Sequence, residues 1–185
     1  MGRLIYSTLA SLDGYIADRD GRFDWAAPGD DLHETVNASL HGVGTFLLGR
    51  RTYEVMRAWD EVDLDEQPAV VAGFARIWRA ADKVVYSRTL PRIDAPRTLL
   101  ERHFDVDEVR RSVASAGRDA AIGGPDLAGP AFRAGIVDEV LVHVFPVLVG
   151  GGTAAFPEVR LDLELAEERR FAHGVVRLAY RRAEG

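Results

Sequence analysis

The 185-residue sequence contains no cysteine, and Lys83 is the only lysine among its 23 basic residues. Without cysteine the chain has no disulfide, thiol nucleophile or thiolate metal ligand, which is typical of a reducing compartment. The N-terminal residues lack the apolar core of a signal peptide, and no apolar run reaches the ~20 residues that span a bilayer. We therefore expect a cytoplasmic protein without a membrane partner.

The charge balance and the absence of several common motifs argue against further classes of protein. The 29 acidic and 23 basic residues give a net charge of −6, which does not favour nucleic acid as a partner. The histidines are not spaced as in zinc sites, so we expect no metal. A strand followed by G-x-G-x-x-G, the P-loop pattern and the G-x-S-x-G elbow of hydrolases are all missing. These absences argue against Rossmann proteins, P-loop proteins and serine hydrolases.

Strand and helix patterns alternate through most of the chain. Leu32, Val36 and Leu40 are spaced four apart, which predicts a helix over 30–40. No linker divides the sequence, so we expect a single domain over 1–185 with a mainly parallel central sheet and helices on both faces. Other expected strands cover 3–9, 15–17, 45–48, 83–87, 120–122 and 139–149; other helices cover 52–59, 69–78, 105–115 and 127–134; an antiparallel C-terminal edge hairpin covers 161–171 and 174–182.

Two glycine turns each follow a short apolar strand and precede a helix. The first is Gly49-Arg50-Arg51-Thr52, and the second is Gly123-Gly124. A helix N-terminus offers unpaired N–H groups, and arginine adds cationic donors that suit phosphate. The sequence therefore predicts one phosphate-bearing ligand held between the two turns.

The order of the motifs resembles that of the dihydrofolate reductase superfamily. The segments 49–53, 86–89 and 122–124 look like the cofactor turns of that fold. Residues 127–156 and the Ser11-Leu12-Asp13-Gly14 turn resemble the C-terminal reductase domain of bifunctional riboflavin biosynthesis proteins. The resemblance covers nearly the whole chain and implies a dihydrofolate-reductase-like three-layer α/β fold.

The resemblance also implies NADPH as the cofactor. A side chain at the diglycine would block close approach of the nicotinamide, and arginine binds the 2′-phosphate better than lysine does. The alternative is that the arginines are solvated surface charges and the diglycine is a turn that needs positive φ. The implied contacts are Gly49, Arg50, Arg51 and Thr52 to the pyrophosphate and 2′-phosphate, Ser87, Arg88 and Thr89 to the adenosine, and Gly123 and Gly124 to the nicotinamide.

On the substrate side, the resemblance points to a carboxylate on the first helix. Trp25, Pro28 and Asp31-Leu32 resemble the dihydrofolate reductase segment whose acid binds the pterin, so Asp31 is the leading catalytic candidate. Asp30 and Glu34 are alternatives, as is a purely helix-capping role. A second catalytic candidate is Asp13, for which turn formation is an equally reasonable role. A flat aromatic pocket is expected from Tyr6, Trp25, Tyr53 and Phe156, although such residues are commonly core.

The sequence thus predicts an NADPH-dependent oxidoreductase that transfers a hydride to a CH–NH or C=O group of a small pterin-like, pyrimidine-like or carbonyl substrate. Riboflavin reductases often carry a lysine in the first strand and a cysteine-containing deaminase partner. This chain has neither, so the riboflavin substrate is not implied. The alternatives are a non-catalytic NADP-binding or sensory module and a flavin- or deazaflavin-dependent reductase.

The C-terminal part also predicts a homodimer. The strand over 139–149 carries apolar residues on both faces, and the stretch from 146 to 156 adds more apolar surface. Symmetric pairing is the commonest way to bury such a patch. The resemblance implies the same region, because riboflavin reductase domains pair through their C-terminal sheet.

Overall fold

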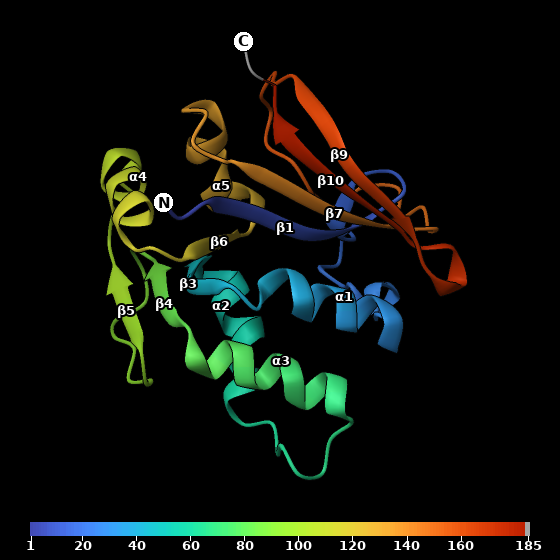
Figure 1. Cartoon of the computed structure of the whole chain (residues 1–185), viewed down its shortest axis with the longest axis horizontal. Coiled ribbons are helices and arrows are strands. Elements are labelled where there is room, and N and C mark those ends of the chain that lie inside the picture. Colours follow the sequence, from blue (N-terminus) through green and yellow to red (C-terminus); the bar gives the residue numbers. More distant parts are fainter. Residues whose placement is uncertain (184–185) are drawn as a thin grey trace.

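A computed structural model describes residues 1–183, which fold around one eight-stranded sheet of order β5-β4-β3-β6-β1-β7-β10-β9 (Figure 1). Its strands are β1 (Leu4–Ser11), β3 (Val43–Gly49), β4 (Asp82–Tyr86), β5 (Thr98–Glu101), β6 (Asp119–Gly123), β7 (Glu139–Phe145), β9 (Leu163–Arg170) and β10 (Val176–Arg182). A small second sheet pairs β2 (Tyr15–Ala17) with β8 (Thr153–Ala154).

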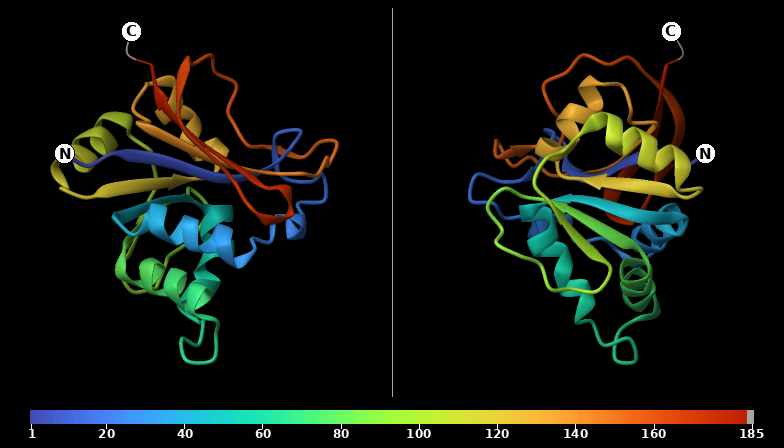
Figure 2. Two further views of the ribbon diagram at one scale, coloured as in Figure 1. Left: turned by 45° about the vertical axis from the view of Figure 1, so that its right-hand side comes forward. Right: turned by 90° about the vertical axis from the view of Figure 1, so that its left-hand side faces the viewer.

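Helices cover both faces of the large sheet, as the sequence predicts (Figure 2). The helices α1 (Asp30–Leu40), α2 (Arg50–Met56) and α3 (Ala69–Ala80) lie on one side, and α4 (Val106–Ser115) and α5 (Pro125–Arg133) lie on the other. Three short 3₁₀ turns are η1 (Asp24–Ala26), η2 (Arg57–Asp60) and η3 (Ala172–Gly174). None of the helices within residues 1–183 is long and apolar enough to cross a membrane.

The strand directions confirm a mainly parallel sheet with an antiparallel edge. β1 runs parallel to β6 and β7, and β3 runs parallel to β4 and β6. β10 is antiparallel to both β7 and β9, so the C-terminal hairpin closes one edge. Because parallel strands end at the same edge, the turns after β3, β4 and β6 face the same way.

Local sequence explains where the helices begin. In α1 the buried Leu32 and Leu40 form the apolar face, while Asp30 and Asp31 occupy the first turn, where carboxylates favour the helix dipole. α1 has the bounds that the spacing predicts. In α4 the Asp105 side chain accepts hydrogen bonds from the backbone N–H groups of the first turn and caps the helix.

Several elements differ from the prediction. The strand expected over 139–149 stops at Phe145, because Pro146 has no N–H to donate and positive φ angles at Gly150–152 turn the chain. The helix expected over 52–59 begins at Arg50 and tightens into η2 at Arg57. The short strands β5 and β8 were not predicted, since four and two residues are too few for a periodic signal.

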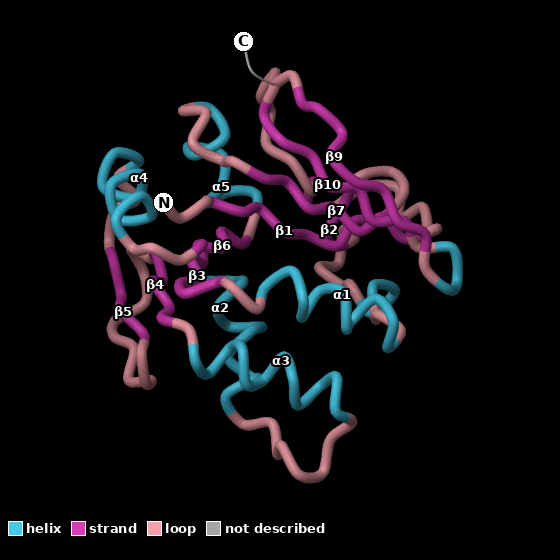
Figure 3. Tube along the Cα trace, viewed as in Figure 1, coloured by secondary structure: helices cyan, strands magenta, loops and turns pink. Residues whose placement is uncertain are grey.

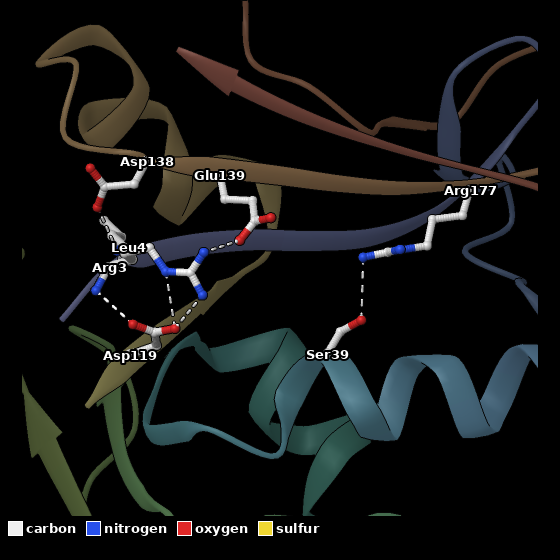
Figure 4. Close-up of polar contacts among 7 residues, drawn as sticks. All are labelled: Arg3, Leu4, Ser39, Asp119, Asp138, Glu139 and Arg177. Atoms are coloured by element: carbon white, nitrogen blue, oxygen red, sulfur yellow. Dashed lines mark hydrogen bonds and ion pairs between the residues drawn. The ribbon is translucent and has the colours of Figure 1, made fainter. Parts of the chain in front are cut away.

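An ion-pair cluster holds the first residues of β1 between β6 and β7 (Figure 4). The Arg3 guanidinium lies 2.7 Å from Asp119 Oδ2 and 2.9 Å from Glu139 Oε2. The Leu4 N–H donates to Asp138 Oδ2 at 2.8 Å. Burial raises the pKa of Asp119, but the hydrogen bonds and charge of Arg3 outweigh it and hold that pKa below its usual value. The cluster therefore fixes the amino end of β1 in the middle of the sheet.

Replacing Arg3 with alanine should lower the free energy of unfolding by about 1 kcal/mol at pH 7, a modest figure because the side chain is half-exposed. A depressed carboxyl pKa contributes stability above about pH 4 that is lost as the pH falls through the folded-state pKa of Asp119. The difference in unfolding free energy between the wild type and R3A, measured by urea denaturation, should therefore be smaller at about pH 3 than at pH 7.

The matched control for this prediction is R92A. The Arg92–Asp94 pair is 3.4 Å apart, and its side chains are 83% and 87% exposed, so its loss should be undetectable. Equal losses for R3A and R92A at pH 7 would contradict the proposed role of the Arg3 cluster.

Candidate functional site

The three turns predicted to bind a cofactor lie on adjacent strands. β4, β3 and β6 are neighbours in the sheet, and the turns follow their carboxyl ends. β3 runs directly into α2 and β6 runs almost directly into α5 (Figure 3). The carboxyl edge of a parallel sheet is where α/β proteins commonly bind ligands.

The diglycine turn lies against the first turn of α2. Gly124 has a φ of +91°, and a Cβ built on it would lie 2.8 Å from Thr52 Oγ1. A Cβ on Gly123 would lie 3.2 Å from Thr52 Cγ2 and 3.3 Å from Leu48 Cδ2. The strand-to-helix turn thus needs glycine both for its backbone angle and for its contact with α2.

Arg50 joins α2 to the turn after β4. Its Nη1 donates to Thr89 Oγ1 at 3.0 Å, and its Nε lies 2.7 Å from Glu54 Oε1. Ser87 Oγ accepts hydrogen bonds from the N–H groups of Thr89 and Leu90 and shapes that turn. These contacts hold a half-exposed guanidinium between two of the predicted turns.

Two more predicted arginines, Arg51 and Arg88, are exposed beside these turns. Arg102, which was not predicted, donates to the carbonyls of Ser87 at 2.9 Å and Pro91 at 3.1 Å. Arg102 therefore stabilises the turn after β4 by binding its backbone carbonyl groups. No sequence pattern predicts this role, because Arg102 follows β5, a strand too short for a periodic signal.

The Asp31 side chain accepts hydrogen bonds from the first turn of its own helix and from η3. Its Oδ1 accepts the Leu32 N–H at 2.8 Å, and its Oδ2 accepts the Ala172 N–H at 3.2 Å. The Ala172 hydrogen bond, followed by that of Leu32, lowers the pKa of Asp31. Asp31 is thus ionised at neutral pH, which suits binding of an N–H group better than proton donation. The alternatives Asp30 and Glu34 are exposed on the same helix.

Trp25 and Asp31 line one cavity of about 230 Å³ at the start of α1. Phe145 at the end of β7 and His173 in η3 also line it. The buried Trp25 Nε1 has no hydrogen-bond partner within residues 1–183. Native proteins rarely leave a buried donor unpaired, so Trp25 Nε1 and the Asp31 carboxylate are the candidate polar contacts for a ligand in this cavity.

Asp13 has a turn-forming geometry. Its Oδ1 accepts from Ser11 Oγ at 2.7 Å and from the Val149 N–H at 3.1 Å, and its Oδ2 accepts from the Gly150 N–H at 2.7 Å. The Ser11 hydrogen bond is the largest of the influences that lower its pKa. These contacts join the turn after β1 to the glycine bend before β8.

The four predicted aromatic residues do not line one pocket. Tyr6 is fully buried beneath α5, donates its hydroxyl to the Ala155 carbonyl, and lies 5.9 Å from Phe156. Tyr53 belongs to the core cluster on the α3 side, and Trp25 belongs to a third cluster near the end of β7. The alternation of side chains along β1 places Tyr6 on the face opposite to α1.

His33 is a titratable residue of α1 that the motif search did not select. Its ring lies 6.0 Å from both Trp59 and Phe74, and burial lowers its pKa while Asp30 raises it. The spacing of histidines in a sequence cannot reveal a single half-buried ring of this kind.

Comparison with known proteins identifies the family. Residues 3–177 match the model of the RibD C-terminal domain. The chain belongs to the RibD C-terminal domain family. It is 28% identical over 182 residues to the uncharacterized protein YyaP of Bacillus subtilis, covering 96% of this chain and 94% of that protein.

A second relative and a solved structure add to this comparison. The chain is 31% identical over 155 residues to the riboflavin biosynthesis protein RibD of Mycobacterium tuberculosis, covering 80% of this chain but only 43% of that protein. Its fold matches a dihydrofolate reductase from Enterococcus faecalis complexed with NADP(H), with a TM-score of 0.69, 19% identity, and 99% and 98% of the two chains covered. The dihydrofolate-reductase-like fold is confirmed.

The single lysine of this RibD C-terminal domain lies away from the turns after β3 and β6. Lys83 is buried in β4, where its Nζ donates to the carbonyls of Trp78 at 3.2 Å and Ala81 at 3.1 Å. It therefore caps the end of α3. Arginine is the only fixed cation that the three turns present.

Gly124→Ala should destabilise the protein by about 1–3 kcal/mol, because the new Cβ forces a strained φ and meets Thr52. Removing Oγ1 in a Thr52→Ala background should recover part of this loss. A double-mutant cycle by urea denaturation measures the coupling between the two positions.

Gly14→Ala is the control for positive φ without a contact, because a Cβ there would have no neighbour within 4 Å. The loss of unfolding free energy caused by Gly14→Ala should be the same whether residue 52 is threonine or alanine. If the Gly124→Ala cost is equally independent of Thr52, the two turns do not meet as described.

Proposed function

We propose that this protein is an NADPH-dependent reductase that acts on a CH–NH or C=O group of a small heterocyclic or carbonyl substrate. The observation that carries the proposal is the guanidinium of Arg50, held by Glu54 and Thr89 where the turns after β3 and β4 meet. A held arginine loses little freedom when it binds a phosphate bidentately. Membership of the RibD C-terminal domain family supports the same cofactor.

The residues around the turns fit this cofactor. Three arginines supply positive charge, and the diglycine presents backbone without side chains. NADPH, when bound, supplies a hydride to the substrate. The proposed contacts are those expected from the sequence: Gly49, Arg50, Arg51 and Thr52 for the phosphates, Ser87, Arg88 and Thr89 for the adenosine, and Gly123 and Gly124 for the nicotinamide side.

The cavity beside Trp25 is the proposed place for part of the substrate. An ionised Asp31 accepts an N–H from a pterin-like or pyrimidine-like ring, and the unpaired Trp25 Nε1 donates to a ring oxygen or nitrogen. Apolar walls from Leu32 and Phe145 exclude water from the ring faces. Asp31 therefore orients the substrate, and the proton that accompanies the hydride comes from another donor.

A second candidate is a module that binds NADPH without catalysis. Both predicted acids, Asp13 and Asp31, are engaged in backbone hydrogen bonds that lower their pKa values, which favours this alternative. Oxidation of NADPH in the presence of dihydrofolate or a pyrimidine supports the reductase. Tight NADPH binding without turnover across such substrates supports the module. A coloured protein as purified would instead support the flavin alternative.

The protein should bind NADPH more tightly than NADH. Arg50→Ala should weaken NADPH binding by about ten- to a hundredfold, the value of a charge-assisted pair, and should affect NADH far less. A fluorescence titration with each nucleotide measures both affinities. Arg57→Ala, at the opposite end of α2, is the matched control and should bind both nucleotides as the wild type does. Equal affinities of the wild type for NADPH and NADH would overturn the cofactor proposal.

We also propose that the protein is a cytoplasmic homodimer that pairs through its C-terminal sheet. The apolar strand β7 is covered within the chain, since Val140, Leu141 and Val142 are all buried. Exposed apolar side chains lie instead on β9 and the loop before it, and are Phe156, Val159, Leu163 and Leu165. A second copy that covers this apolar patch would bury it symmetrically.

Light scattering at micromolar concentration should give twice the 20.3 kDa chain mass. Leu165→Glu should shift the mass toward one chain, because it places a charge in the patch, where the side chain is 52% exposed. Leu99→Glu, at a similarly exposed site on the opposite edge strand β5, should leave the dimer intact. A wild-type mass near 20.3 kDa that does not change on dilution would rule out the dimer.

A further inference from the structure

Two arginines of the large sheet differ in how their guanidinium groups are paired (Figure 4). Arg3 is half-exposed, yet three of its nitrogen atoms donate to two carboxylates. Arg177 on β10 has a side chain that is only 10% exposed, and it meets one carboxylate. The more deeply buried cation thus has the poorer set of acceptors, which is the reverse of what desolvation demands.

Two of the three nitrogen atoms of the Arg177 guanidinium lack a close acceptor among the described residues. Its Nη1 lies 2.7 Å from Glu167 Oε1, whereas its Nη2 has only a long 3.4 Å contact with Ser39 Oγ of α1. Its buried Nε has no acceptor within the described part of the chain, residues 1–183. In Arg3, the corresponding Nε and Nη2 atoms donate to Asp119 Oδ2 at 3.2 and 2.7 Å. Nε and Nη2 of Arg177 therefore form an unfilled fork of the kind that binds carboxylate or phosphate.

An unpaired acceptor lies on the neighbouring strand, at the position that pairs with Arg177. His143 on β7 stands opposite Arg177 in the antiparallel register and is 1% exposed. Its Nδ1 lies 3.3 Å from the Thr8 carbonyl oxygen, so Nδ1 carries the proton and Nε2 is left as an acceptor. Nε2 is buried and has no partner among residues 1–183. Burial lowers the pKa of His143 to about 4, so the ring is neutral at pH 7 and Arg177 is the cation of this cross-strand pair.

Arg177 borders an open groove of about 540 Å³ between α1 and the β9–β10 hairpin. Thr35 and Ser39 line one wall, and Arg169 joins Arg177 on the other. Two carboxylates also border the groove, Asp31 and Glu34 on α1. β10 is separated from β3 by β7, β1 and β6, so the groove is distinct from the turns after β3 and β4.

We propose that this groove binds a small ligand that carries an oxyanion and a hydroxyl group. The oxyanion accepts from Nε and Nη2 of Arg177. His143 does not itself line the groove, so the hydroxyl reaches past Arg177 to donate to His143 Nε2. Hydrogen phosphate and α-hydroxycarboxylates share this chemistry, whereas sulfate and acetate lack the proton for His143. The proposal does not depend on the reductase function, because it uses none of the turn residues.

The test follows the Arg177 Nε–H and His143 Nε2 resonances of the full chain by ¹H–¹⁵N NMR. The probes are inorganic phosphate against sulfate, and glycolate against acetate, in a buffer free of other oxyanions and without NADPH. An R50A/R88A background removes cations of the proposed cofactor turns. Phosphate, glycolate or both should shift the two resonances together and saturably, and their relative affinities identify the ligand class.

Arg177→Lys keeps the charge but removes the fork, so it should weaken binding by about ten- to a hundredfold. Arg181→Lys, an exposed arginine of the same strand, is the matched control and should bind as the parent does. If R177K does not fold, the resonances of the parent protein still decide the question.

Absence of a saturable shift with all four anions would overturn the proposal. Shifts confined to other arginines, or equal affinities of R177K and the parent, would do the same. Because NADPH is absent, failure of this test leaves the reductase proposal unaffected, and failure of the NADPH titration leaves this proposal unaffected.

Discussion

The contact between the diglycine turn and the first turn of α2 determines the shape of the candidate cofactor site. Gly124 at a φ of +91° brings the backbone after β6 against Thr52, and no other residue fits both the angle and the space. Thr52 and Arg50 belong to the same helix turn, and Arg50 in turn holds Thr89. One close approach therefore aligns the turns after three adjacent strands before any ligand binds.

The predictable parts of this structure are those that local periodicity or a turn residue specifies. Leu32, Val36 and Leu40 give the bounds of α1, and Gly123-Gly124 marks the end of β6. Arg102 escapes prediction because its contacts reach back over ten residues to carbonyl groups, which have no sequence signature. The aromatic pocket was expected from residue type alone, and the alternation of side chains along β1 removes Tyr6 from it.

The acids show why residue type does not establish a chemical role. A carboxylate on the first helix suits both a proton donor and a helix cap, and the distinction depends on what its oxygens meet. Asp31 meets N–H groups of Leu32 and Ala172, and Asp13 meets those of Val149 and Gly150. Donors of this kind favour the ionised form of a carboxyl group. Both acids are therefore better suited to accept hydrogen bonds from backbone or substrate N–H groups than to release a proton.

Helix α1 lies between the cavity beside Trp25 and the groove beside Arg177, and each of these two places has a buried N–H group without a partner among residues 1–183. Its first turn contributes Asp31 to the cavity that holds the unpaired Trp25 Nε1, and two turns later Ser39 touches the open fork of Arg177. His33 faces the aromatic rings near α3 from the same helix. Asp31 lines both the Trp25 cavity and the groove at Arg177, so the two spaces share α1 as a common wall.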